Sequence, residues 1–396
     1  MSTAFYQVVF CSLLIGLVSP ATAGTEANAG VVSAEFGYVA DFLHNASGGI
    51  KNGSAYLQNV DAMFTLDLRR IPGFGGGSLF AYLLWNDAST FSDRYAGDSQ
   101  GVSNIEAERA LRLYEFWYEH RFAGVLGLRF GLYDLNSEFD AVDSVSLFLN
   151  SSHGIIPTYS QTGERGPSIF PVTSLTARLH WQIDKHNLIR YALLDAVPGD
   201  PDDPSATAIQ FNSGEGVLHA LEYVRDFSNG LRLGLGAFSY TAEFESLIER
   251  DASGNPVRSG GNTGWYGFAD ASVYEDAARG RSAAAFVRYG AANGALNPFE
   301  RYLGAGTVLS GFIPRRPDDQ FGIAVAIAWC GGDFRAATGA EGHETAIELT
   351  YRARITDGLE VQPDIQYIVN PGTDPALDNA LVLGIRIALG RGFELD

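Results

Sequence analysis

The chain has 396 residues, of which 46 are acidic and 27 are basic, so its formal net charge is −19. Such an acidic protein is a poor candidate for binding nucleic acid, whose phosphates attract basic surfaces. Its two cysteines, Cys11 and Cys330, are too few for a disulfide framework. These properties argue against a nucleic-acid partner and against a small disulfide-stabilised fold.

The first 23 residues are predicted to be a cleaved signal peptide. Residues 8–18 form an apolar run that is too short to span a bilayer, and residues 21–23 read Ala-Thr-Ala, which resembles a signal-peptidase site. The leader lacks the usual basic residues, and the alternatives are a buried first strand or a tail anchored by Cys11. Cleavage would start the mature chain at Gly24 and leave Cys330 as its single thiol.

After the leader, apolar and polar residues alternate in about sixteen short runs; residues 384–389, for example, read Gly-Ile-Arg-Ile-Ala-Leu. Side chains of a strand alternate between its two faces, so each run has one apolar and one polar face. We therefore predict strands at residues 31–41, 58–69, 78–87, 111–121, 124–133, 174–183, 187–195, 217–226, 231–241, 264–274, 282–290, 302–312, 320–329, 344–354, 359–369 and 379–389.

The links between these strands alternate in length along most of the chain. Residues 120–124, 184–186, 226–230 and 356–358 contain the Gly, Asn and Asp residues of tight hairpin turns. The longer links are residues 42–57, 88–110, 134–173, 196–216, 242–263 and 330–343. In an antiparallel barrel alternate links lie at opposite ends, which would gather the long links on one rim and the short turns on the other.

These patterns predict an all-β fold: a transmembrane, antiparallel, up-and-down barrel of about 16 strands in one domain, residues 24–396. A closed barrel satisfies every backbone hydrogen bond within a bilayer, with an apolar outer face and a polar lumen. The mean hydropathy is near zero, as expected when half of each strand faces water. We expect long extracellular loops and short periplasmic turns.

The alternation also predicts which face each side chain occupies. A basic side chain facing lipid at mid-depth costs roughly 2–4 kcal/mol, so the arginines of the strands should face the lumen. In 111–121 the assignment is ambiguous; we place Glu115 and Glu119 inward, and hence Tyr114 outward. The outward residues are Phe64, Leu66, Leu68, Leu126, Leu128, Phe130, Leu132, Leu175, Leu179, Trp181, Ile347, Leu349 and Tyr351. The inward, channel-lining candidates are Asp67, Arg69, Arg129, Tyr133, Arg178, Glu348 and Arg352.

The link at 134–173 is the main candidate for function, because unstructured links of this length are uncommon and tend to be functional. Residues 139–150 resemble a short helix whose Leu147, Phe148 and Leu149 need to be buried. If the link folds into the lumen it narrows the pore; the alternative is an outer cap over neighbouring loops. Polar residues that would then contact a solute are Asn136, Glu138, His153 and Arg165.

No catalytic or metal motif stands out. The chain lacks G-x-S-x-G, and His343-Glu344 is not followed by the second histidine of a zinc-protease helix. The acidic loop near Asp200 could hold calcium, although its spacing is not that of an EF-hand and a solvated turn is the simpler interpretation. A catalytic pair of carboxylates, as in a glycoside hydrolase, stays an alternative, because the 46 acidic residues offer many pairs. We predict no catalytic residues, cofactor or metal.

Several longer motifs resemble the carbohydrate-selective porins (OprB-type) of Gram-negative outer membranes. They are Asn-Ser-Glu-Phe-Asp at 136–140, Phe-Leu-Asn-Ser-Ser-His-Gly-Ile at 148–155, Gly-Glu-Arg-Gly-Pro-Ser-Ile-Phe-Pro-Val-Thr-Ser-Leu at 163–175, Leu-Asp-Ala-Val-Pro-Gly-Asp-Pro at 194–201 and Gln-Pro-Asp-Ile-Gln-Tyr-Ile-Val-Asn-Pro-Gly at 362–372. The resemblance implies a sixteen-stranded barrel in the outer membrane that gives passive passage to sugars, with the long link near the constriction.

The sequence therefore predicts a porin for passive, sugar-preferring diffusion of small carbohydrates, without a chemical step. Its partners would be small carbohydrates, outer-membrane lipid and other copies of the chain in a homo-oligomer. A general or ion-selective porin of the same fold is the first alternative. A secreted, soluble, β-rich glycoside hydrolase is the second.

Overall fold

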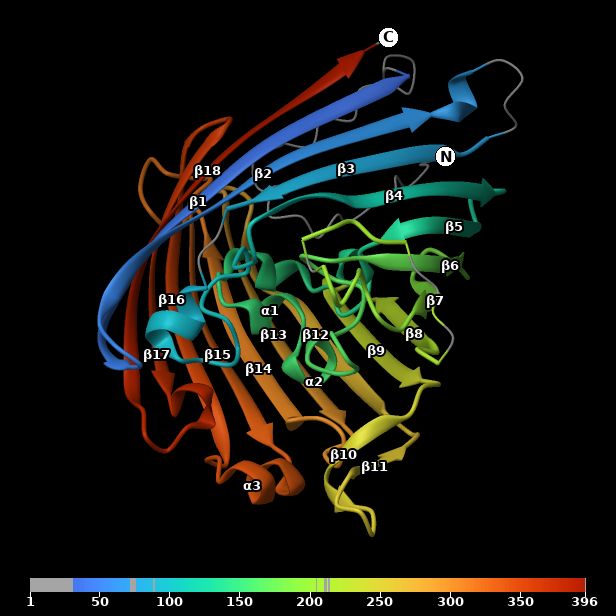
Figure 1. Cartoon of the computed structure of the whole chain (residues 1–396). Helices are drawn as coiled ribbons and strands as arrows, with labels where there is room; N and C mark the ends of the chain where they lie inside the picture. Colours follow the sequence, from blue (N-terminus) through green and yellow to red (C-terminus); the bar gives the residue numbers. More distant parts are fainter. Residues whose placement is uncertain are drawn as a thin grey trace.

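The computed structural model describes residues 31–71, 76–87, 90–203, 205–209, 212 and 214–395. The predicted signal peptide lies outside these residues. Sixteen antiparallel strands form a closed barrel (Figure 1). They are β1 (Val32–Gly49), β2 (Gly53–Asp67), β3 (Ser78–Asn86), β4 (Ala110–Phe122), β5 (Leu126–Tyr133), β6 (Ser174–Gln182), β7 (Asn187–Asp195), β8 (Val217–Asp226), β9 (Leu231–Tyr240), β12 (Thr263–Asp276), β13 (Arg281–Ala292), β14 (Phe299–Ser310), β15 (Gln320–Cys330), β16 (His343–Thr356), β17 (Leu359–Val369) and β18 (Asp378–Leu395).

The barrel closes where the first strand meets the last. β1 pairs antiparallel with β18 from Val32 opposite Leu395 to Gly49 opposite Asp378. Every other barrel strand pairs with its neighbours in the chain, except that β10 (Phe244–Arg250) and β11 (Pro256–Ser259) form a separate hairpin between β9 and β12. The up-and-down topology and the strand number agree with the prediction, and closure leaves no free edge in the sheet.

The two rims differ as predicted. Short turns such as 123–125, 183–186, 227–230 and 357–358 lie at one end, while α3 (Gly332–Thr338) and the β10–β11 hairpin lie together at the other (Figure 1). One predicted long link, 42–57, is wrong: β1 and β2 pair as far as Asn45 opposite Gly53, so only residues 46–52 connect the two strands beyond their ladder. The Gly, Ser and Asn residues of this segment suggest a loop, but the pairing of β1 with β2 continues through residues 42–45 and 53–57.

Burial confirms the alternation of faces along much of the strands, although Leu132 on β5, which was assigned outward, is only 2% exposed. On β5, Phe130 is 52% exposed on the outer face, whereas its neighbour Arg129 is 3% exposed on the inner face. Trp181 on β6 and Ile347 on β16 are also exposed, and Glu348 beside Ile347 is buried. Among the described residues, no helix is both long and apolar enough to cross a membrane.

A β-bulge in β4 overturns one part of the facing assignment. Tyr82 on β3 pairs with Glu115 and the next residue, Leu83, pairs with Leu113, so Tyr114 is an extra residue in the ladder. The bulge turns Tyr114 inward, where it is 3% exposed, although strict alternation placed it outward. Glu115 still faces inward, as predicted, because the bulge lies directly before it.

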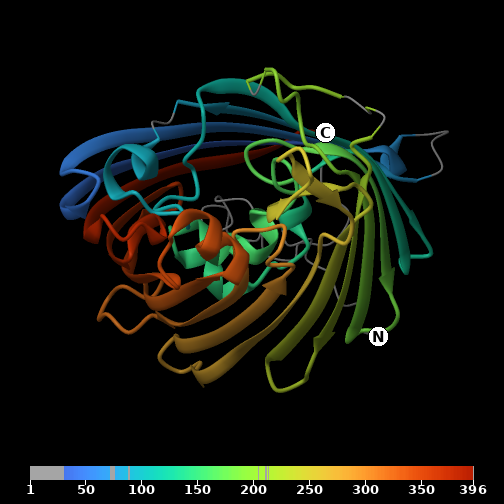
Figure 2. The same cartoon turned by 60° about the horizontal axis from the view of Figure 1, so that its bottom comes forward.

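The inner wall has two different halves. The inner faces of β7–β9 and β12–β16 carry mostly apolar and small residues, and the link between β5 and β6 covers them inside the barrel (Figures 1 and 2). The inner faces of the remaining strands mix aromatic rings with acids, amides and arginines. Apolar residues of the covered half include Ala192, Leu218, Phe238, Tyr266, Phe286, Tyr302 and Ala324.

Candidate functional site

The link from Asp134 to Thr173 folds into four short helical turns. These are η3 (Leu135–Ser137), η4 (Asp143–Leu147), α1 (Ser151–Gly154) and α2 (Pro157–Ser160). The predicted helix over 139–150 is therefore wrong, and only a 3₁₀ turn forms within it. Local capping explains the break: the Asn150 side chain accepts a hydrogen bond from the Ser152 N–H and thereby starts a new helix at Ser151.

Apolar contacts fasten this link to the covered half of the wall. Leu147, Phe148 and Leu149 are buried, as expected. The Phe148 ring lies 5.8 Å from the ring of Phe286 on β13. Farther along the link, Tyr159 stacks on Phe238 of β9 at 4.1 Å. The link thus fills one side of the lumen with a hydrophobic core of its own.

A buried network of charges fixes the start of the link. Arg178 on β6 donates to Glu138 at 2.8 Å and to Glu119 on β4 at 2.7 Å. Arg129 on β5 pairs with Glu119 at 2.9 Å, and the Tyr133 hydroxyl donates to Glu138 at 2.6 Å. Burial alone would raise the pKa of Glu138, but Arg178 and Arg129 hold it well below its usual range. Glu138 therefore stays ionised and bound to the wall.

Two further wall residues hold the middle of the link. Glu348 on β16 accepts hydrogen bonds from the backbone N–H groups of Leu149, at 2.6 Å, and Asn150, at 3.0 Å. Arg288 on β13 donates to the Asp140 carboxylate and to the His153 carbonyl oxygen. Charged wall residues that could have lined a channel therefore position the link instead.

The link between β3 and β4 is a second segment inside the barrel. Its η2 (Ser92–Ala96) precedes a stretch whose Gln100 N–H donates to Glu344 of β16 at 3.0 Å. Its backbone also joins the first link: Asn104 N–H donates to the Leu149 carbonyl, and Ser151 N–H to the Gly101 carbonyl, each at 2.8 Å. The two links form one insert that is anchored to opposite walls.

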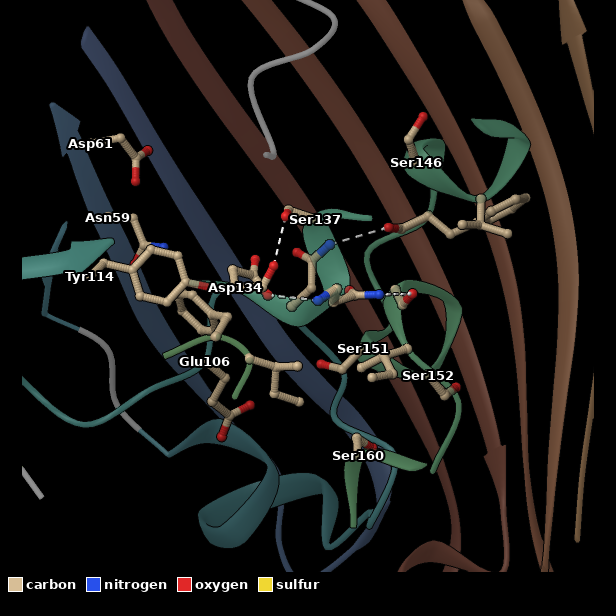
Figure 3. A pocket seen from close by; sticks show the side chains of 18 of the residues that line it. Asn59, Asp61, Glu106, Tyr114, Asp134, Ser137, Ser146, Ser151, Ser152 and Ser160 are labelled. Atoms are coloured by element: carbon tan, nitrogen blue, oxygen red, sulfur yellow. Dashed lines mark hydrogen bonds between the residues drawn. The ribbon is translucent and has the colours of Figure 1, made fainter. Parts of the chain in front are cut away.

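Beside this insert lies a cavity of about 320 Å³. One side is the polar and aromatic wall of β2–β4, with Asn59, Asp61, Tyr82 and Tyr114. Figure 3 shows Asn59, Asp61 and Tyr114 facing serines of the insert across the cavity. The remaining side belongs to β16–β18 and supplies Arg352, Glu360, Gln362 and Arg386.

The links contribute two carboxyl groups to the cavity whose pKa values are raised. Burial raises the pKa of Glu106 to about 8, and the nearby Asp98 adds to the rise. Burial also raises the pKa of Asp134 to about 6. Glu106 accepts hydrogen bonds from the backbone and side chain of Ser92. At neutral pH the cavity therefore holds one largely protonated link carboxyl and one largely ionised one.

The eleven channel-lining candidates separate into four groups. Asn136 and Arg352 line the main cavity, and Arg165 lines a second cavity near it. Six others are buried in contacts with the insert or the wall: Arg129, Tyr133, Glu138, His153, Arg178 and Glu348. Asp67 and Arg69 lie at the short-turn end, because β2 ends at Asp67 and the chain continues as η1 (Leu68–Arg70). Arg69 pairs there with Asp67 at 2.8 Å.

Sequence reasoning missed most of the cavity lining. The inward position of Tyr114 could not be predicted, because the alternation of apolar and polar residues does not reveal the bulge. Gln100, Asn104 and Glu106 belong to the link between β3 and β4, which is more than twenty residues long. Gln362 lies in the motif at 362–372 that resembles the porin family. Length alone could have marked the second link as part of the site.

A closed sixteen-stranded barrel whose lumen is narrowed by inserted links is the architecture of an outer-membrane porin. The family model described as "carbohydrate-selective porin, OprB family" matches residues 51–390, and the chain belongs to that family. It is a protein of the Gram-negative outer membrane and its fold is that of a channel rather than an enzyme.

Individual relatives are distant in sequence and close in fold. Porin B of Pseudomonas aeruginosa is 22% identical over 395 residues, which cover 88% of this chain and 85% of that protein. A high-pH structure of Pseudomonas putida OprB is similar with a TM-score of 0.80 at 22% identity, covering 91% of this chain and 94% of that one. A low-pH structure of the same protein has a TM-score of 0.59 at 16% identity, covering 91% and 92%.

The acidic loop near Asp200 has the contacts of ordinary turns. Asp200 accepts from the Asp202 N–H at 2.9 Å, and Asp203 accepts from the Ser205 hydroxyl at 2.7 Å. Across the part of the chain that the structure describes, no group of three or more His, Cys, Asp or Glu side chains could hold a metal ion.

Proposed function

We propose that this porin gives passive, sugar-preferring passage to small carbohydrates through the cavity beside the insert. The supporting observation is the composition of its two sides. Tyr82 and Tyr114 supply aromatic faces near Asp61, while Arg352 and Gln362 supply planar hydrogen-bonding groups opposite. Sugars have apolar ring faces and many hydroxyls, so aromatic faces combined with planar donors and acceptors suit them.

A sugar passes through a channel readily only if its binding to the channel is favourable but weak. A hydroxyl that leaves water must find an equivalent partner in the cavity, and it must give that partner up again. Much of the polar lining is held by neighbouring protein groups; Tyr82, for example, donates to Asp61 at 2.7 Å. Such pre-arranged groups lose little entropy when a sugar arrives, and they retain a partner when it departs. Fast exchange follows, as a channel requires.

The proposal is tested by sugar block of the ion current through single channels in planar bilayers. Glucose should reduce the current with a saturable, millimolar-range dependence, while a polyether of similar size should reduce it only in proportion to its volume. Arg352→Gln removes a charged donor from the cavity and should weaken the block several-fold. Arg225→Gln on β8 is the matched control, because its guanidinium lies over Phe227 near a short turn.

Equal effects of glucose and the polyether would contradict sugar preference. The chain would then be a general porin of the same fold. Unchanged glucose block in Arg352→Gln, with a protein that still forms channels, would place the sugar-binding surface elsewhere in the barrel.

A further inference from the structure

A second cavity of about 220 Å³ lies between the long links. It shares Ser160, Ile169 and Phe170 with the lining of the main cavity, so the two cavities adjoin. Two arginines line it, Arg112 near the start of β4 and Arg165 in the link between β5 and β6. The second cavity therefore brings together two guanidinium groups that are distant in sequence.

Both arginines are held in place by neutral oxygen atoms among their contacts. Arg165 Nη1 donates to the Pro198 carbonyl oxygen, and Arg112 Nη1 donates to the amide oxygen of Asn86, each at 3.3 Å. Within the described lining of this cavity, Glu108 is the single carboxylate against two guanidinium groups. The lining thus carries one excess positive charge in a chain whose net charge is −19.

The position of this cavity places it before the main cavity for a solute that enters from outside. Arg112 lies at the long-link end of β4, and Pro198 belongs to the link between β7 and β8. The walls include Pro167, Pro171 and Pro198, whose backbone angles are restricted, so the shape of the cavity is largely pre-formed. A rigid basic pocket at the outer mouth can hold an anionic group before the solute moves inward.

We propose that this cavity binds the carboxylate of an acidic sugar, such as a sugar bearing a carboxylate in place of its terminal hydroxymethyl group. A guanidinium matches a carboxylate with two parallel hydrogen bonds, and it is the side chain best suited to this recognition. The sugar ring would extend toward Ile169 and Phe170, the residues shared with the main cavity. The proposal rests on the sugar-channel function and adds a class of substrate to it.

The experiment compares D-glucuronate with D-glucose, which differ at one carbon, as blockers of single-channel current. Each sugar is added separately to the long-link side and to the short-turn side. Glucuronate added to the long-link side should block at a lower concentration than glucose, and at a lower concentration than glucuronate from the other side. Arg165→Gln should weaken this block about five-fold, the scale of one screened charge at contact distance, and leave glucose block unchanged.

Three variants accompany Arg165→Gln. Arg112→Gln should reproduce its effect from a different element, which protects the test against a misfolded loop. Glu108→Gln should strengthen glucuronate block, because it removes the opposing charge. Arg94→Gln is the matched control, since Arg94 is exposed on a neighbouring long link and lines neither cavity.

Equal block by both sugars from both sides would overturn the acidic-sugar site and leave the sugar channel intact. Loss of glucose and glucuronate block together in Arg165→Gln would also overturn it, because the residue would then act on the whole channel. If neither sugar blocks the wild-type protein, the proposed channel function itself fails.

Discussion

Arg178 on β6 holds Glu138, forty residues earlier in the chain, through a hydrogen bond of 2.8 Å between two buried side chains. Glu138 follows η3, where the chain leaves the wall and enters the lumen. This ion pair therefore sets the point from which the insert crosses the barrel, and with it the space left for the cavity.

Glu138→Gln should loosen the insert without opening the barrel. Removing one partner of a buried ion pair typically costs about 3–5 kcal/mol, because the other charge is left unpaired. Single-channel recordings should show a larger and noisier current than in the wild type. Glu164→Gln is the control, since Glu164 is exposed on the same link. A quiet current of wild-type size in Glu138→Gln would show that the other contacts of the insert hold it without this ion pair.

Gly322 on the inner face of β15 tests the apolar contacts separately. A Cβ atom at this position would lie 2.7 Å from Leu147 Cδ2 and 2.9 Å from the Phe148 ring. Gly322→Val should therefore displace the middle of the insert and increase the conductance. At Gly267 on β12 the nearest atom would be 3.4 Å away, so Gly267→Val is the comparison. Identical currents in the two variants would mean that the insert can shift without changing the cavity.

Ion selectivity should depend on pH through Glu106. Its raised pKa, about 8, means that the folded protein holds this proton at pH 7 and releases it as the pH rises through 8. A negative charge then appears in the cavity lining, and the preference for cations over anions should increase between pH 7 and 9. Reversal potentials in a salt gradient measure this change, and Glu106→Gln should reduce it. An equally large change in the variant would assign the titration to other groups.

Deleting residues 140–165 should leave the barrel closed, because the ladder from β1 to β18 and the pairing of β5 with β6 do not use them. A closed barrel resists detergent until it is heated, so unboiled and boiled samples should still migrate differently on a gel. The ion conductance should rise and sugar block should disappear together. Sugar block that survived the deletion would place selectivity in the barrel wall.

Most of the barrel could be predicted from the sequence, because neighbouring side chains of a strand point to opposite faces. An apolar residue beside a polar one therefore shows which face is turned to lipid and which to the lumen. Arg129 beside Phe130 shows this directly. The failures came where backbone geometry changed without a change in composition. Tyr114 turned inward through one extra residue, and β1 and β2 continued through a segment rich in turn-forming residues.

The site was harder to predict, because facing the lumen does not decide what a side chain meets there. Glu348 was correctly placed on the inner face, but it binds the backbone of Leu149 rather than open water. His153 was expected beside a solute; it is buried against Phe148, and burial lowers its pKa to about 3, with Arg288 adding to the effect. Glu348 and Leu149 are 199 residues apart, and Arg288 and His153 are 135 residues apart, so the local sequence pattern could not predict these contacts.

Because the insert covers one half of the inner wall, the width of the passage does not depend only on the perimeter of the barrel. Strand number and tilt set the perimeter, and in an unfilled barrel they would also set the calibre. Here a packed insert occupies one side, so substitutions on the surface of the insert can widen, narrow or recharge the passage while the sixteen strands stay as they are. Such a chain can acquire a different range of solutes while the strands that insert into the membrane stay unchanged.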